Sequence, residues 1–281
     1  MKTHSMFMSR ITLFIILAAM ACCFLSCQQI VSVDLNEASP HIVIEGVVKD
    51  SPGPYSIVLS MSGNYFASST YFPPVSGALV VMTDDLNQLD TLKESVSGTY
   101  LTFAIKGIPG TSYQMKVIAE GKEYDAASSM PTKVFIDSLY AKLRTGFGGG
   151  TGYDIYIVFK DPPQPNNYNY YRVNAQSSAL IPADSIDGLR YRLFTDELTK
   201  GQEMTVRIRG GDKVNKGDTI TIDLLSIDKA TYDYFHTLSN ILTSDQSPTS
   251  LAPANPNTNI SGDALGYFAA YTVDSKRIVL P

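Results

Sequence analysis

The stretch HIVIEGVV, residues 41–48, is rich in β-branched residues and is followed by the turn signal Pro52-Gly53-Pro54. β-Branched side chains pack well on a pleated sheet, and proline with glycine interrupts a strand, so this stretch predicts a β-strand. Similar runs follow, with turn signals about 8–12 residues apart, a spacing typical of a β-sandwich. Further strands are expected at residues 55–60, 78–83, 99–105, 112–119 and 122–128. Residues 41–131 are therefore predicted to form an N-terminal β-sandwich.

A second region begins after Pro131-Thr132, where the expected strands become longer. These strands are predicted at residues 134–144, 153–161, 168–178, 189–195, 203–209, 218–224, 266–273 and 277–280. The pair at 203–209 and 218–224 flanks a polar loop and predicts a long hairpin. Apolar residues recur every three to four positions over 226–243, which predicts one long helix with Ser226 or Asp228 as its N-cap. The fold class is therefore mainly β, with a second antiparallel β domain at 132–281 that carries this helix.

The N-terminal stretch ITLFIILAAMACCFLSC, residues 11–27, has the pattern of an export signal. Lys2 and Arg10 precede an apolar run that is too short to span a bilayer comfortably, and a small residue, Ser26, precedes Cys27. Residues 24–27 resemble the lipobox of bacterial lipoproteins, so Cys27 is the expected lipidation site. This predicts a signal peptide at 1–26 and a lipidated tether at 27–40. A plain secretory signal and a membrane-spanning anchor remain as alternatives.

Charge and cysteine content restrict the partners and the means of stabilisation. Without residues 1–26 the chain has 255 residues, with 20 basic against 27 acidic side chains, a formal charge of −7. Binding of nucleic acid depends on grouped lysine and arginine, so no nucleic-acid partner is expected. All cysteines lie at or before Cys27, so no disulfide can staple the mature fold. Stability must come from burial, for which 44% hydrophobic residues suffice.

Catalytic signatures are scarce in this sequence. After the signal, only His41 and His236 could serve as a general base or a zinc ligand, and both are expected to be ordinary structural residues. The motifs of serine hydrolases, zinc peptidases and P-loop proteins do not occur. We therefore expect no enzyme, no catalytic residue, no cofactor and no metal site.

Two segments imitate ligand-binding loops. Asp84, Asp85, Asn87 and Asp90 resemble a calcium loop in composition, but leucines interrupt the set and the central glycine is missing, which favours a hairpin turn. The glycine-rich segment 146–152 would cradle a phosphate only if it opened a helix. A strand-like alternation follows it, so a hairpin loop is expected.

Aromatic residues on a loop are the most suggestive feature for binding. Tyr65, Phe66, Tyr71 and Phe72 fall within residues 64–74, NYFASSTYFPP. Aromatic side chains on a loop offer a large amphipathic contact area for a sugar, a peptide or a protein, so these four are the candidate ligand- or partner-binding residues. The alternative is that they fold back over the open end of the sandwich. The tyrosines of residues 166–171 are expected to pack partly within the sheet.

An ordered set of short motifs resembles the lipoproteins grouped as domain-of-unknown-function family 4249. The motifs are residues 75–81 (VSGALVV), 97–100 (SGTY), 107–113 (GIPGTSY), 121–126 (GKEYDA), 196–198 (DEL), 201–203 (GQE), the helix with Tyr232 and Tyr234, 255–260 (NPNTNI) and 266–271 (GYFAAY). The likeness covers most of residues 27–275. It implies a Bacteroidota outer-membrane lipoprotein, made beside a TonB-dependent transporter as its accessory. The first half is also similar to sandwiches of the immunoglobulin or transthyretin type, including carboxypeptidase regulatory domains. The family carries no established catalytic residues.

The expected function is that of a non-catalytic accessory or ligand-capture module in the outer membrane. The expected partners are the membrane, through the N-terminal lipid, a TonB-dependent transporter and a nutrient ligand. One alternative is a structural or adhesive surface lipoprotein, and another is a hydrolase that uses carboxylates, since paired acids suffice for glycoside cleavage. Display at the cell surface and orientation towards the periplasm both remain open. The acids that often follow the cysteine of surface lipoproteins are preceded here by residues 28–32, QQIVS.

Overall fold

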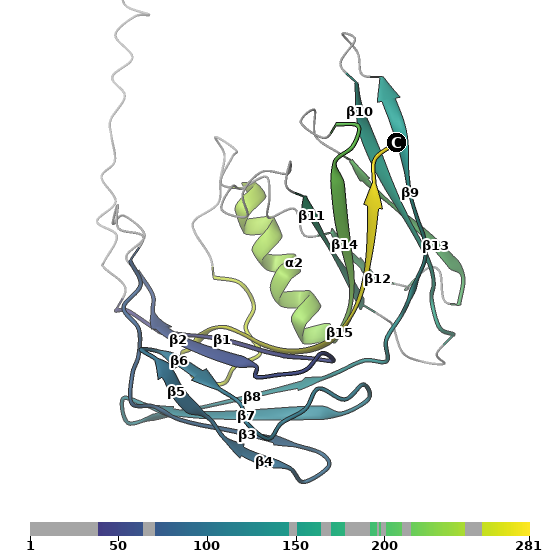
Figure 1. Cartoon of the computed structure of the whole chain (residues 1–281). Coiled ribbons are helices and arrows are strands. Elements are labelled where there is room, and N and C mark those ends of the chain that lie inside the picture. Colours follow the sequence, from purple (N-terminus) through teal and green to yellow (C-terminus); the bar gives the residue numbers. More distant parts are fainter. Residues whose placement is uncertain are drawn as a thin grey trace, which may run out of the picture. The chain divides into compact units, whose positions relative to one another are not determined.

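The elements of the chain come from a computed structural model, shown in Figure 1. It describes residues 39–63, 71–145, 151–163, 170–177, 192–195, 197, 201–209, 215–244 and 255–281. Cys27, the signal sequence and most of the tether lie outside these residues. The strands are β1 (Ile42–Lys49), β2 (Ser56–Met61), β3 (Leu79–Asp84), β4 (Leu89–Thr91), β5 (Lys93–Val96), β6 (Thr99–Leu101), β7 (Ser112–Ala119), β8 (Lys122–Ser129), β9 (Ile136–Thr145), β10 (Thr151–Lys160), β11 (Tyr170–Ser177), β12 (Arg192–Thr195), β13 (Glu203–Arg209), β14 (Thr219–Ile227) and β15 (Leu265–Val279), and the helix is α2 (Lys229–Ser244). The expectation of a mainly β fold with antiparallel sheets and one long helix is confirmed for the described residues.

The first core lies between two sheets, as expected for a sandwich. One sheet has the order β4-β3-β7-β8, and the other contributes β1, β2 and β6 from a larger sheet of order β12-β11-β14-β15-β1-β2-β6-β5. Alternate residues of these strands point inward, as in β7 and β8, whose burial alternates along their length. The large side chains buried there include Ile44, Ile57, Leu59, Met82, Tyr100, Tyr113 and Met115.

The long strand β15 joins the two halves of the chain. Its first part, residues 265–271, pairs in parallel with β1, and its second part, residues 272–279, pairs antiparallel with β14. The parallel pairing is very close at Gly266, where φ is +96° and a Cβ atom would lie 2.1 Å from the carbonyl oxygen of Ile44. Only glycine fits this position, because it lacks a Cβ and adopts positive φ readily.

The second core lies between the sheet of order β13-β10-β9 and the strands β11, β14 and β15. Phe159 of β10 meets Tyr171 of β11 edge to face, with ring centroids 5.0 Å apart. The hydroxyl of Tyr171 donates to the buried carboxylate of Asp161. Buried tyrosines usually need such a partner for the hydroxyl, so this pair combines apolar packing with a satisfied polar group.

Asp228, the residue before Lys229, is the N-cap of helix α2. Its Oδ1 accepts a hydrogen bond from the amide of Thr231 at 2.8 Å. Its Oδ2 accepts bonds from Ser128 Oγ at 2.7 Å and from the Ser129 amide at 3.1 Å, which ties the helix start to β8. The buried side chains Tyr234 and Phe235 pack on Tyr267 of β15, with ring centroids 4.7 and 5.0 Å apart.

Several expected boundaries are wrong. Ser226 is not the cap, because it still belongs to β14 and pairs with Tyr171 of β11 and with Thr272 of β15. Residues 203–209 and 218–224 do not form a hairpin, since β13 pairs with β10 whereas β14 pairs with β11 and β15. The two expected C-terminal strands are one, β15. The strand expected at 99–105 ends at Leu101 because the next residues turn towards Asp90.

The division of the chain at residue 131 stays a prediction. The first core includes buried residues up to Met130, and the second core begins with Val134. Later in the chain, however, the first core again includes Ile260, Ala264, Phe268 and Ala270. In the described residues, no helix has both the length and the apolar character needed to cross a bilayer.

Candidate functional site

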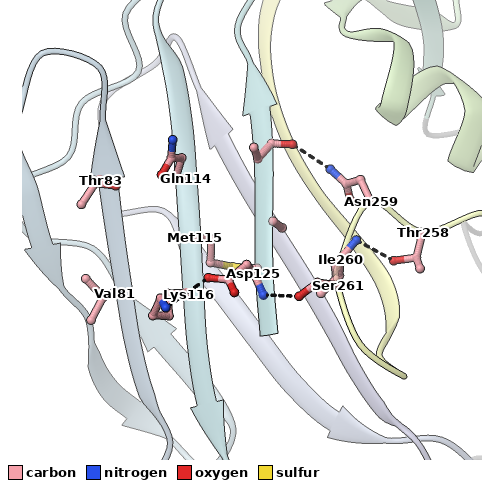
Figure 2. Close-up of a pocket in the computed structure, with 12 residues that line it drawn as sticks. Val81, Thr83, Gln114, Met115, Lys116, Asp125, Thr258, Asn259, Ile260 and Ser261 are labelled. Atoms are coloured by element: carbon pink, nitrogen blue, oxygen red, sulfur yellow. Dashed lines mark hydrogen bonds and ion pairs between the residues drawn. The ribbon is translucent and has the colours of Figure 1, made fainter. Parts of the chain in front are cut away.

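The outward face of the sheet β4-β3-β7-β8 is hollowed into a groove of about 580 Å³ (Figure 2). Its floor consists of outward side chains from neighbouring strands, which the register sets in two rows: Val81, Lys116 and Asp125 in one, and Thr83, Gln114 and Ala127 in the other. The opposite residues of the same strands fill the first core. The alternation that builds the sandwich therefore also fixes which side chains line the groove.

The segment 258–261 forms a wall along β8. Asn259 holds it, because its side-chain amide donates to the carbonyls of Ala127 and Phe268 at 3.1 and 2.7 Å and accepts from the Phe268 amide at 3.0 Å. Ile260 is buried and forms a bridge with Ala126. The segment therefore packs on β8.

Ser261 completes the wall through two contacts with Asp125. Its amide donates to the Asp125 carbonyl at 2.8 Å, and its Oγ accepts from the Asp125 amide at 2.8 Å. The polar wall groups are therefore fixed on a sheet edge that would otherwise expose unpaired amides. A wall held in this way presents its hydroxyl and amide groups without a further loss of conformational freedom on binding.

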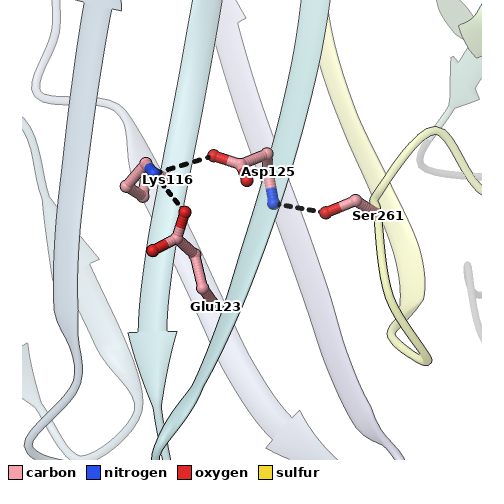
Figure 3. A network of polar contacts seen from close by, with 4 residues as sticks. All are labelled: Lys116, Glu123, Asp125 and Ser261. Atoms are coloured by element: carbon pink, nitrogen blue, oxygen red, sulfur yellow. Dashed lines mark hydrogen bonds and ion pairs between the residues drawn. The ribbon is translucent and has the colours of Figure 1, made fainter.

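An ion network lies at one side of the groove (Figure 3). The Lys116 ammonium pairs with Glu123 and lies 3.5 Å from Asp125. The hydrogen bond to Glu123 raises the pKa of Lys116 above its ordinary value, and the charge of Asp125 adds to this effect. One cation faces two carboxylates, so the network carries a formal charge of −1 and disfavours an anionic ligand at this groove.

Of the candidate aromatic residues, Tyr71 and Phe72 lie on the surface, 70% and 55% exposed. The chain just after them is fixed to β2, because the Met61 amide donates to the Pro73 carbonyl at 2.8 Å and Pro74 forms a bridge with Ser60. These two side chains are therefore displayed to solvent rather than folded over the sandwich. Tyr65 and Phe66 lie outside the described residues. Neither Tyr71 nor Phe72 lines the groove, and the role of the four aromatic residues in binding stays a prediction.

The acidic turn connects β3 to β4, as expected, and its carboxylates serve the backbone. Asp84 Oδ1 accepts from the amides of Leu86 and Gln88 at 3.0 and 2.8 Å. Asp90 is buried, and its Oδ2 accepts three amide bonds, from residues 103, 104 and 105, at 2.6–3.0 Å. Within the described residues, no group of three His, Cys, Asp or Glu side chains is placed to hold a metal ion.

Those remaining candidate residues from the sequence that the structure describes lie among strands and side chains of the fold, outside the groove. Residues 146–150 of the glycine-rich segment lie outside the described residues, and the strands on either side of them, β9 and β10, pair antiparallel. His41 precedes β1, with Nδ1 2.9 Å from the Asp263 carbonyl, and the exposed His236 stacks on Tyr232. Tyr171 is buried in the sheet, as expected for some tyrosines of that segment.

Sequence reasoning missed the groove. Alternation within residues 112–119 and 122–128 could have placed Lys116 and Asp125 on one outward face. The pairing of residues 258–261 with β8 had no signal in the sequence, because it joins segments more than a hundred positions apart through backbone bonds and one asparagine.

The fold and the groove define a class, mainly β proteins with two cores and a surface groove, that many families share. The sequence identifies the family. The model of the family described as "Domain of unknown function (DUF4249)" matches residues 29–277, and the chain belongs to this family. A search of curated proteins finds no match.

Two solved structures show a weak likeness. One is the Yersinia pseudotuberculosis adhesin InvE, 15% identical, covering 66% of this chain and 55% of the adhesin chain, with a TM-score of 0.21. The other is a pullulanase complexed with maltotriose from Anoxybacillus sp. LM18-11, 11% identical, covering 64% of this chain and 24% of the pullulanase chain, with a TM-score of 0.19. Scores this low support no conclusion about fold or function.

Proposed function

We propose that this chain is an outer-membrane lipoprotein, acylated at Cys27, that acts as a binding accessory of a TonB-dependent transporter. The observation that carries the binding role is the groove between the β3-β7-β8 face and the wall at 258–261. Its volume of about 580 Å³ is in the range of small-ligand sites, and its walls are fixed by sheet pairing and by Asn259.

The lining of the groove indicates the class of ligand. Gln114, Thr258 and Ser261 offer uncharged polar groups, whereas Val81 and Ala127 offer small apolar surfaces. The ion network beside them carries excess negative charge. These features suit a polar ligand that is neutral or cationic, such as a short peptide segment or an uncharged sugar.

A carboxylate hydrolase has less support at this groove. Glu123 and Asp125 are close on one strand, but both interact with the same lysine ammonium. Glycoside cleavage needs two carboxylates that flank the scissile bond, whereas these two converge on one ammonium. The arrangement therefore favours binding over catalysis.

The anchoring part of the proposal rests on residues 11–27. Several acyl chains on one cysteine hold a protein durably at a membrane, whereas a single chain does so only marginally. A lipidated Cys27 would keep the groove close to the transporters of the same membrane, which raises their effective concentration.

Co-purification tests the accessory role. The wild-type chain, solubilised from the outer membrane in mild detergent, should bring down a β-barrel transporter. Gln114→Trp places a bulky side chain on the groove floor and should reduce the part of the transporter recovery that depends on a ligand bound in the groove. Gln88→Trp, on the exposed β3-β4 turn, should not change the transporter recovery. Recovery of the lipoprotein alone would contradict the accessory role. Equal behaviour of the two variants would contradict the groove as the binding site.

A further inference from the structure

A second cluster of polar and aromatic side chains lies on the three-stranded sheet β13-β10-β9. Figure 1 shows the ribbons of these three strands. Every second residue of β10 enters the second core, so the residues between them face away from it. The register sets these outward residues beside their counterparts on β9 and β13. We name the cluster the tyrosine–arginine patch; its members are Tyr140, Lys142, Arg144, Asp154, Tyr156 and Arg207.

The patch is positively charged in a chain of net negative charge. Asp154 is at its centre, with a side chain only 6% exposed. Arg207 Nη2 lies 2.5 Å from one carboxylate oxygen and Arg144 Nε lies 3.6 Å from the other. Counted over its six named members alone, the patch has three basic side chains and one acidic side chain, in a chain of net charge −5. Arg209 stands at the register position opposite Asp154.

The two tyrosines form a fixed platform beside these cations. The rings of Tyr140 and Tyr156 stack with centroids 5.1 Å apart and an interplanar angle of 4°. Lys142 Nζ lies 5.5 and 5.1 Å from the two ring centroids. Cation–π attraction and stacking hold the half-buried rings in place, so they can present phenol groups at a small loss of side-chain entropy.

We propose that the tyrosine–arginine patch binds a carboxylate-bearing polysaccharide. Arginine offers a planar fork of donors that matches a carboxylate, and the lysine ammonium adds a further positive charge. Tyrosine contacts the apolar faces and the hydroxyls of a sugar ring at the same time. The patch extends across three neighbouring strands, so it offers contacts in sequence to an extended chain.

Other anionic partners fit this surface less well. An anionic membrane gains little from a patch of three cations, one of which is balanced by Asp154. A nucleic acid needs a larger group of cations than the patch supplies. A polysaccharide carboxylate can instead be met by one or two cations at a time, with the tyrosines contacting the adjacent sugar.

The test is a binding titration of the full chain in non-ionic detergent. The probe is polygalacturonate, and the matched neutral probe is the same polymer with fully methyl-esterified carboxyls. Polygalacturonate should bind, the ester should not, and the binding should weaken with added salt because it is electrostatic. Lys142→Glu should weaken binding by about tenfold. Lys122→Glu makes the same charge change on an exposed position of β8 and should leave binding within about twofold of wild type.

Lys142 is exposed, so neither Lys142→Glu nor a second variant, Lys142→Ala, should disturb folding, which circular dichroism can verify. The proposal is overturned if the wild-type chain does not bind polygalacturonate, if the ester binds equally, or if both Lys142 variants bind like wild type. Binding to phosphatidylglycerol vesicles in place of the polymer would also overturn it. Gln114→Trp should leave this binding intact, so a failure of the groove and a failure of the patch give different results.

Discussion

Replacing Gly266 by alanine tests the junction where β15 joins β1. The added Cβ would lie 2.1 Å from the carbonyl oxygen, 2.8 Å from the carbonyl carbon and 3.0 Å from the amide nitrogen of Ile44. All three are backbone atoms, so the paired strands must separate. The φ of +96° adds strain of about 1–2 kcal/mol for a residue with a side chain. With about 1–3 kcal/mol for the overlap, Gly266→Ala should lower the free energy of unfolding by about 2–5 kcal/mol.

Gly121→Ala is the matched control for Gly266→Ala. Gly121 has a similar positive φ of +75°, but a Cβ there would meet no atom within 4 Å. Only the strain of about 1–2 kcal/mol should remain. Urea denaturation, followed by circular dichroism, gives both values from the shift in midpoint. Equal losses for the two variants would refute the reasoning, because they would mean that the close approach of β1 and β15 contributes nothing.

Three further predictions concern the wall, the helix and the acid response. Asn259→Ala removes three hydrogen bonds and should lower the free energy of unfolding by about 2–3 kcal/mol in urea titrations, whereas Asn257→Ala should change it little. Asp228→Ala removes the helix cap and the bonds to β8 and should cost about 2–3 kcal/mol by the same assay, against about 0.5 kcal/mol for the exposed Asp233→Ala. Hydrogen bonds from the Gly77 and Gly98 amides lower the pKa of Glu94, so its contribution to stability is present above the ordinary value of ~4.3 and is lost as the pH falls through the lowered folded pKa. Glu94→Gln should therefore reduce the dependence of stability on pH between about 5 and 3, and an unchanged dependence would contradict this role.

Local patterns predicted the strands well where the alternation was regular. Residues 112–119 and 203–209 match β7 and β13 at both ends, because each run alternates and is bounded by turn residues. The short strands β4 and β5 were not predicted, since Lys93–Val96 is exposed throughout and has no apolar face. The helix was predicted from the three-to-four-residue period of its apolar side chains. Its first residue could not be predicted, because Ser226 pairs with a strand that is distant in the sequence.

Pairing between distant segments could not be read from the sequence. The parallel contact of β1 with β15 and the bridge between Ala126 and Ile260 depend on which strands meet, and many partners are compatible with the same alternation. The groove and the tyrosine–arginine patch both result from such pairings. The aromatic loop attracted attention because its composition is unusual, whereas Lys116, Asp125 and Asn259 are ordinary residues in ordinary stretches until the fold brings them together.

Palmitate labelling of Cys27 tests most directly the central claim that the chain is a lipoprotein anchored in the outer membrane. Cells that express the wild-type chain are labelled with radioactive palmitate and then fractionated. Label should appear on the wild-type chain and on Cys22→Ala and Cys23→Ala variants, all in the outer-membrane fraction. Cys27→Ala should lose both the label and the membrane association. An unlabelled wild-type chain, with Cys27→Ala fractionating in the same way, would contradict the account.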